Sequence, residues 1–141
     1  MPYDAKLALK TLGSQNANTN GTPVDLLSGT PNGAQLMQFD LYWNAISGTT
    51  PTLDVVIEES PDQTTWRQVT TFRQLNTAGG SQDAVFGGNN VNGKKMPRFG
   101  LATQRYLRYR STFSGTGAAA TFSIFGFGID AVGRDIPRMS L

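Results

Sequence analysis

The chain has 141 residues and contains neither cysteine nor histidine. Disulfide bonds, thiolate catalysis and cysteine-ligated zinc are therefore excluded, and the commonest general base and transition-metal ligand are missing. Twelve basic residues nearly balance ten acidic ones, whereas nucleic-acid-binding domains usually carry a larger and more concentrated positive charge.

The N-terminal region predicts one weak strand followed by a polar connection. Leu7, Leu9 and Leu12 supply the apolar positions of the strand, and residues 13–22 are rich in Gly, Asn and Thr. No apolar segment follows a basic start, so no signal peptide is visible. No apolar run approaches the length of a membrane span. We therefore expect a chain made in a cytoplasm, with no membrane partner.

Strong strand signals begin at Met37. Apolar and polar side chains alternate over residues 37–45, which predicts a half-buried strand. A turn at residues 47–51 leads to a second strand over residues 52–59. The side chains expected in the core are Met37, Phe39, Leu41, Trp43 and Ala45 from the first strand, and Leu53, Val55 and Ile57 from the second.

A turn at residues 60–64 follows, because Pro presets φ and Asp62 can bind the neighbouring backbone. The next strand, over residues 66–74, offers Trp66, Val69 and Phe72 for burial. The spacing of these three residues breaks strict alternation and predicts a bulge.

Residues 76–100 are less regular and predict a short strand near residues 83–86 and a tight turn at 91–94. A clear strand over residues 105–113 directs Leu107, Tyr109 and Phe113 inward. The last strand, over residues 118–129, has apolar side chains on both faces, which indicates a central strand or a contact with another chain. Its glycines, Gly126 and Gly128, allow close approach of a backbone or a ring.

No helical periodicity is sustained anywhere in the sequence. The pattern predicts an all-β fold, a jelly-roll β-sandwich of two antiparallel sheets with extended terminal arms and about seven to nine strands. One domain covers residues 1–141, of which 1–22 form an N-terminal arm and linker and 132–141 an aperiodic C-terminal tail.

Carboxylates are the main catalytic device left to this composition. Glu58 and Glu59 are adjacent on a strand and point to opposite faces, while Asp54 and Glu58 share a face at roughly 13 Å, beyond the usual glycosidase spacing. Asp62 or Asp83 could offer oxygen ligands to calcium, but no EF-hand spacing is present. The glycine-rich stretches precede no helix that would complete a phosphate loop. We expect no enzyme, no cofactor and no metal.

The most basic local cluster is Arg105, Arg108 and Arg110, interleaved with two tyrosines. Such a strand can stack on single-stranded nucleic acid. It can equally anchor a protein interface or form a solvated face. The near-neutral charge of the chain favours the last two, so we expect no nucleic-acid partner.

Several stretches together resemble one family. They are residues 5–9 (Ala-Lys-Leu-Ala-Leu), residues 55–62 (Val-Val-Ile-Glu-Glu-Ser-Pro-Asp) with Trp66, and residues 105–109 (Arg-Tyr-Leu-Arg-Tyr). In these stretches and in its length, the chain is similar to the capsid cement (decoration) proteins of short-tailed bacteriophages. The resemblance spans nearly the whole chain.

The resemblance implies a non-catalytic jelly roll on the outer face of a phage capsid, within the virion. Its partners would be the major capsid protein and further copies of itself, with a dimer preferred and a trimer as the alternative. It would bridge capsid subunits and stabilise the shell against DNA pressure. From the aperiodic ends, a basic loop and the arginine cluster, we expect these interface residues: Tyr3, Lys6, Lys94, Lys95, Arg98, Arg108, Arg110, Arg134 and Arg138.

Two rival functions remain open. A carbohydrate-binding or receptor-binding module of a phage fibre or tail would need a flat aromatic platform, for which Tyr42, Trp66 and Tyr106 are the candidates. A glycosidase would need two converging carboxylates in a cleft.

Overall fold

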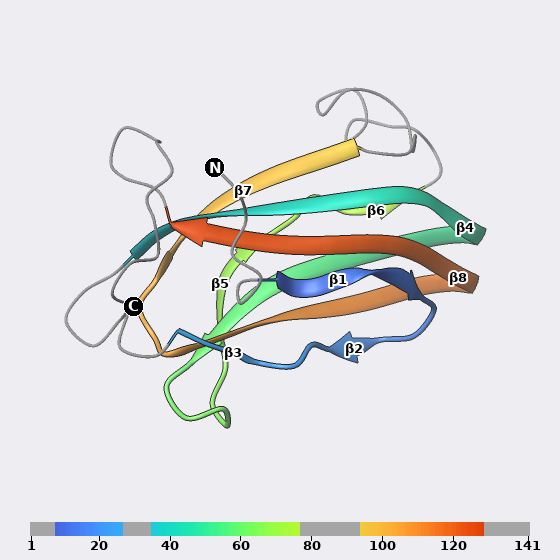
Figure 1. Ribbon diagram of the computed structural model, residues 1–141. Helices are drawn as coiled ribbons and strands as arrows, with labels where there is room; N and C mark the ends of the chain where they lie inside the picture. Colours follow the sequence, from blue (N-terminus) through green and yellow to red (C-terminus); the bar gives the residue numbers. More distant parts are fainter. Residues whose placement is uncertain (1–7, 27–34, 77–93, 129–141) are drawn as a thin grey trace.

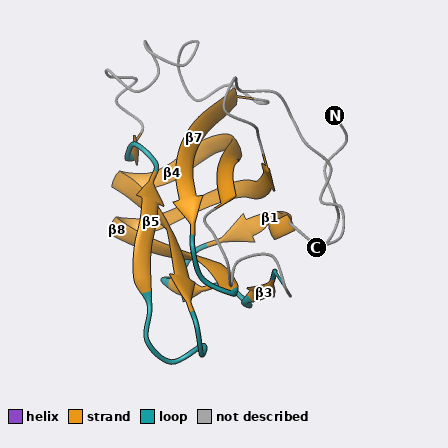
Figure 2. Cartoon of the chain, turned by 90° about the vertical axis from the view of Figure 1, so that its left-hand side faces the viewer, coloured by secondary structure: helices purple, strands orange, loops and turns teal. Residues whose placement is uncertain are grey.

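The computed structural model describes residues 8–26, 35–76 and 94–128, apart from the side chains of Asn44, Ala45 and Lys94. Within these ranges the chain forms eight antiparallel strands and no helix (Figures 1 and 2), and hence no helix that could cross a membrane. The all-β prediction is confirmed. The strands are β1 (Ala8–Gln15), β2 (Thr19–Asn20), β3 (Val24–Asp25), β4 (Gln35–Ser60), β5 (Arg67–Thr71), β6 (Leu75–Asn76), β7 (Lys94–Ala102) and β8 (Tyr106–Gly128).

Strands β4 and β8 form a long antiparallel ribbon that folds back on itself. The first half of the ribbon pairs β4 from Met37 to Trp43 with the end of β8, and the second pairs β4 from Thr52 to Ser60 with its beginning. Figure 1 shows both strands turning together at the same end of the molecule. Each strand therefore reverses its direction between the first and the second half. One face of the first half is turned toward one face of the second.

Short strands extend each half of the ribbon on both sides. Beside the first half, β7 pairs with β4 and β1 pairs with β8. Beside the second half, β5 and β6 pair with β4, whereas β2 and β3 pair with β8. Strands β5 and β7 then approach one another, since Arg98 Nε donates to the Thr71 carbonyl at 3.2 Å. The result is a nearly closed antiparallel sheet.

The core lies between the two halves of the ribbon. Alternate residues of each strand point inward, and the apolar ones from both halves belong to a single buried cluster. Burying one such side chain stabilises the fold by about 1.5–3 kcal/mol. The structure buries most of the predicted core residues on both halves: Met37, Phe39, Leu41, Trp43, Leu53, Val55, Ile57, Phe72, Leu107 and Tyr109. Val69 and Phe113 are only partly buried against this core.

Several local predictions are also confirmed. The pairing of β4 with β5 shifts register between Ile57 and Glu58, which is the expected bulge. Asp62 accepts hydrogen bonds at 2.9 Å from the backbone N–H groups of Thr64 and Thr65. A Cβ on Gly126 would lie 3.0 Å from the Phe39 ring, so this glycine does admit an aromatic ring.

Other predictions are wrong. Part of the expected linker forms strands, because β1 continues to Gln15 and β2 follows it. The expected basic loop is strand β7. Pro97 obscured that strand in the sequence, yet Pro is tolerated where a strand has a free edge, and in the described residues β7 pairs only with β4. The short strand at 83–86 and the 91–93 part of the predicted turn lie outside the described residues.

Trp66 and Asp40 also differ from expectation. Trp66 is half-buried against the outer face of the second half and does not enter the core. Asp40 sits on the predicted polar face of β4 yet is only 1% exposed, and it accepts a hydrogen bond from Gln38 Nε2 at 2.8 Å.

The fold-back of the ribbon requires unusual backbone conformations. Positive φ angles occur at Gly48 (124°) and Thr50 (45°) in β4, and at Gly115 (96°) and Gly117 (65°) in β8. A Cβ on Gly115 would lie 2.5 Å from the Thr50 carbonyl oxygen. The two bends therefore pack backbone against backbone.

Two alanine substitutions distinguish the energetic cost of a clash between the bends from the cost of backbone strain alone. Gly117→Ala should destabilise the fold by about 1 kcal/mol, because a Cβ there meets nothing within 4 Å and only the φ penalty applies. Gly115→Ala should cost at least about 3 kcal/mol, since strain and a backbone clash combine. Urea denaturation midpoints measure both changes. Equal losses would show that the contact between the bends does not matter.

Candidate functional site

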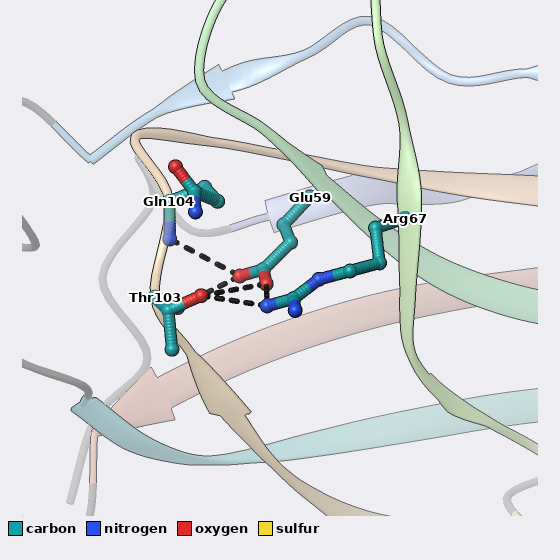
Figure 3. A network of polar contacts seen from close by, with 4 residues as sticks. All are labelled: Glu59, Arg67, Thr103 and Gln104. Carbon is teal, nitrogen blue, oxygen red and sulfur yellow. Dashed lines mark hydrogen bonds and ion pairs between the residues drawn. The ribbon is translucent and has the colours of Figure 1, made fainter.

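Glu59 joins three parts of the chain from a buried position. Its side chain is 1% exposed and pairs with Arg67 of β5. It also accepts hydrogen bonds from Thr103 N at 2.7 Å, Thr103 Oγ1 at 2.8 Å and Gln104 N at 3.2 Å, between β7 and β8 (Figure 3). The carboxylate therefore connects β4 to β5 and to the β7–β8 turn.

The environment of Glu59 favours its charged form. Burial alone would raise the pKa of its carboxyl, but the hydrogen bonds from Arg67, Thr103 and Gln104 outweigh that effect. The pKa is lowered from its usual 4.5. A catalytic acid needs the opposite shift, so the geometry suits a structural anion.

Glu58 points to the opposite face, as predicted from the alternation of a strand. Its two oxygens accept hydrogen bonds from Arg108 Nε and Arg110 Nε, both at 3.0 Å. The guanidinium of Arg108 lies over the Trp66 ring, 4.0 Å from its centroid. These four side chains (Trp66, Arg108, Glu58 and Arg110) form one connected set on the outer surface, which we call the arginine face.

The other described carboxylates also have donors close by. Both oxygens of Asp25 accept from Arg105 at 2.8 Å, and both oxygens of Asp54 lie 3.1 Å from Gln74 Nε2. Within the described residues, no three acidic side chains come close enough to hold a metal ion. The carboxylates are thus engaged in contacts that position the strands.

Lys10 is likewise bound within the fold, by hydrogen bonds to backbone carbonyls. Its ammonium donates to the carbonyls of Thr11, Gly13 and Phe122 at 2.9–3.2 Å and lies 4.3 Å from the centroid of the Phe122 ring. Burial lowers the pKa of this amine. It lines an open pocket of about 340 Å³ beside Pro23 and Val24. Because three carbonyl oxygens accept hydrogen bonds from its ammonium, Lys10 has no N–H donor left for a ligand in this pocket.

The predicted interface residues whose side chains the structure describes do not form one cluster. Arg108 and Arg110 lie on the arginine face, while Lys95 is exposed on β7 and Arg98 is half-buried, bound to backbone carbonyls of Thr71 and Pro97. For Lys94 only the strand position is described. Four further candidates lie outside the described residues: Tyr3, Lys6, Arg134 and Arg138.

The three candidate platform rings do not share a surface. Tyr42 belongs to the first half of the ribbon and packs edge-on against Phe125, whereas Trp66 and Tyr106 lie on the second half. One face of the Trp66 ring is covered by Arg108, and Arg105 lies 5.2 Å from the centroid of Tyr106. Nothing in this arrangement favours a flat stacking surface for a sugar.

An exposed apolar pair was missed from the sequence. Phe99 and Leu101 alternate on the outward side of β7 and are 55% and 54% exposed. Leu36 lies directly opposite Leu101 on β4 and is half-buried. The alternation on either side of Gly100 was the available signal, but Pro97 and Gly100 argued against a strand.

No protein-family model matches this chain, and no curated protein matches it significantly in sequence.

Replacing the Glu59 carboxylate should destabilise the fold strongly. We expect Glu59→Gln to lower the free energy of unfolding by about 2–4 kcal/mol, because the buried donors of Thr103 and Gln104 lose a charged acceptor. Arg67→Ala is the matched control. Its side chain is 65% exposed and Glu59 keeps its other donors, so the expected loss is below about 1 kcal/mol. Chemical denaturation would contradict this if the control were the more damaging change.

Acid should remove the contribution of Glu59. A carboxyl whose pKa is depressed on folding stabilises the fold above its unfolded value, here 4.5, and this stabilisation is lost as the pH falls through the folded pKa. The difference in unfolding free energy between the wild type and Glu59→Gln should therefore shrink below pH 4.5. Denaturation series between neutral pH and pH 3 test this. A difference that does not change with pH would contradict it.

Proposed function

We propose that this chain is a jelly-roll capsid decoration protein. It is made in a host cytoplasm and binds the outer face of a phage shell. There it bridges neighbouring major capsid subunits and stabilises the shell against DNA pressure, without catalysis. The family resemblance of the sequence supports this function, and the exposed apolar side chains of the described residues support a role in protein contact.

The strand order supports the jelly-roll part of the proposal. One half of the ribbon has the order β7-β4-β8-β1, and the other has β5 and β6, then β4, β8, and finally β2 and β3. Folding a two-stranded ribbon in the middle and adding a return strand to each side generates two antiparallel sheets with such an order. The shared core of the two halves fits this arrangement.

The observation that carries the function is the exposed pair Phe99 and Leu101. Large apolar side chains that are more than half exposed and adjacent on one strand face mark a surface for protein contact. They stand on β7, which pairs with β4 and comes close to β5. A preformed surface of this kind binds without a large ordering cost.

The bridging role follows from several weak contacts acting together. An oligomer, a dimer or alternatively a trimer, would touch more than one capsid subunit. Each additional contact is then intramolecular and gains avidity through effective concentration. A folded sheet stabilised by buried aromatic rings and by the Glu59 contacts is rigid enough to connect the subunits mechanically.

The test is co-sedimentation of the full chain with empty shells of the phage that encodes it. We expect the wild type to sediment with shells and the double variant Phe99→Ser/Leu101→Ser to bind at least about tenfold more weakly, as for a central apolar contact. Leu12→Ser is the matched control, because Leu12 is 66% exposed on β1, a different strand.

The controls determine what a negative result means. Thermal unfolding must show that all variants are folded, and light scattering must report their mass. A folded wild type that ignores shells from its own phage would contradict the proposed function. Equal binding by the double variant and Leu12→Ser would remove Phe99 and Leu101 as its basis.

A further inference from the structure

Arg110 lies on the outward side of β8 with part of its guanidinium group unengaged. Its Nε donates to Glu58 Oε2 at 3.0 Å, and its side chain is 42% exposed. Among the described residues it has no other hydrogen-bond partner, so the Nη1 and Nη2 donors remain available. A planar fork of N–H donors matches the two oxygens of a carboxylate.

A chain of contacts holds this guanidinium in place. The Trp66 ring packs on the guanidinium of Arg108, whose side chain is only 17% exposed. Arg108 fixes one oxygen of Glu58, and the other oxygen fixes Arg110. Because Arg110 is ordered before any partner arrives, binding through it costs less conformational entropy than binding through a free surface arginine.

The Glu58 group by itself carries one more positive than negative charge. Two guanidinium groups share the single carboxylate of Glu58, so this group retains one positive charge. Arg105, at the start of the same segment, is paired through both of its bonded nitrogens with Asp25. The unbalanced charge is therefore centred on Arg110, the more exposed of the two arginines bound to Glu58.

We propose that the arginine face docks a protein partner through a carboxylate side chain placed over Arg110. The inference rests on the proposed function, in which a shell subunit supplies that carboxylate. Arginine and tryptophan are the residue types enriched at the energetic centres of protein interfaces. A phosphate backbone is a poorer match, because nucleic acid selects a row of concentrated basic charge, whereas Arg105 is already paired with Asp25 and Arg108 with Glu58.

The experiment compares the wild type with two variants that each remove one positive charge. Arg110→Gln alters the arginine face, and Arg67→Gln, whose side chain is 65% exposed on β5, is the matched control. Binding is measured at low salt to empty shells, to immobilised poly-L-glutamate and to a single-stranded DNA oligonucleotide. We expect Arg110→Gln to weaken binding to shells and to poly-L-glutamate about tenfold, and Arg67→Gln by less than about twofold.

The outcomes separate this inference from the proposed function. If the wild type ignores shells but binds poly-L-glutamate through Arg110, the docking chemistry stands and the proposed function fails. If shells bind equally well to Arg110→Gln, the docking face is wrong and the proposed function stands. If both variants lose the same amount of binding, the effect comes from the net charge of the protein and the inference is overturned. If the wild type binds the oligonucleotide more tightly than poly-L-glutamate, and this binding depends on Arg110, the inference is overturned in favour of a nucleic-acid partner.

Discussion

The fold depends on the simultaneous bending of β4 and β8. A flat ribbon as long as these two strands could bury only one face against other elements, whereas a folded ribbon buries its own two halves against each other. The bend brings Gly115 against the Thr50 carbonyl, at a distance that leaves no room for a side chain. The apolar cluster of Phe39, Trp43 and Phe122 on one half can then meet Leu53 and Ile57 on the other.

Two consecutive glutamates of β4, Glu58 and Glu59, make contacts on opposite faces of the sheet. Glu59 faces the gap between β5 and the β7–β8 turn and helps to close the sheet there. Glu58 faces outward and orders the side chains of Arg108 and Arg110. A difference of one residue along a strand thus separates a contact that stabilises the fold from one that shapes a surface.

Most of the framework could be predicted from local alternation. Residues 37–43 and 53–57 follow the period of a strand, and the structure buries them as expected. Strand β7 could not be predicted in this way, because Pro97 and Gly100 are unfavourable within a strand. Pro97 is tolerated because β7 pairs only with β4 in the described residues. Gly100 leaves room for Val69 of β5, which a Cβ would meet at 2.6 Å. The position of Trp66 depends on stacking with Arg108, a contact between distant segments that no local pattern reveals.

The candidate site was predictable in part for the same reason. The arginines of β8 could be assigned to an outward face, but their shared partner Glu58 lies fifty residues away in sequence from Arg108. The exposure of Phe99 and Leu101 depends on which face of β7 points away from the core. Each of these surfaces is defined by strand pairing, which the sequence of a single segment does not contain.

The margins of one half of the ribbon limit how copies of this chain can associate. Strand β1 is interrupted by two register shifts, and the Lys10 ammonium takes up carbonyls beside it, while β7 carries a proline that has no N–H to donate. Bulges, lysine and proline are devices that prevent strands of separate molecules from pairing along their backbones. Even at high local concentration, backbone pairing between copies along these two edges is thereby disfavoured.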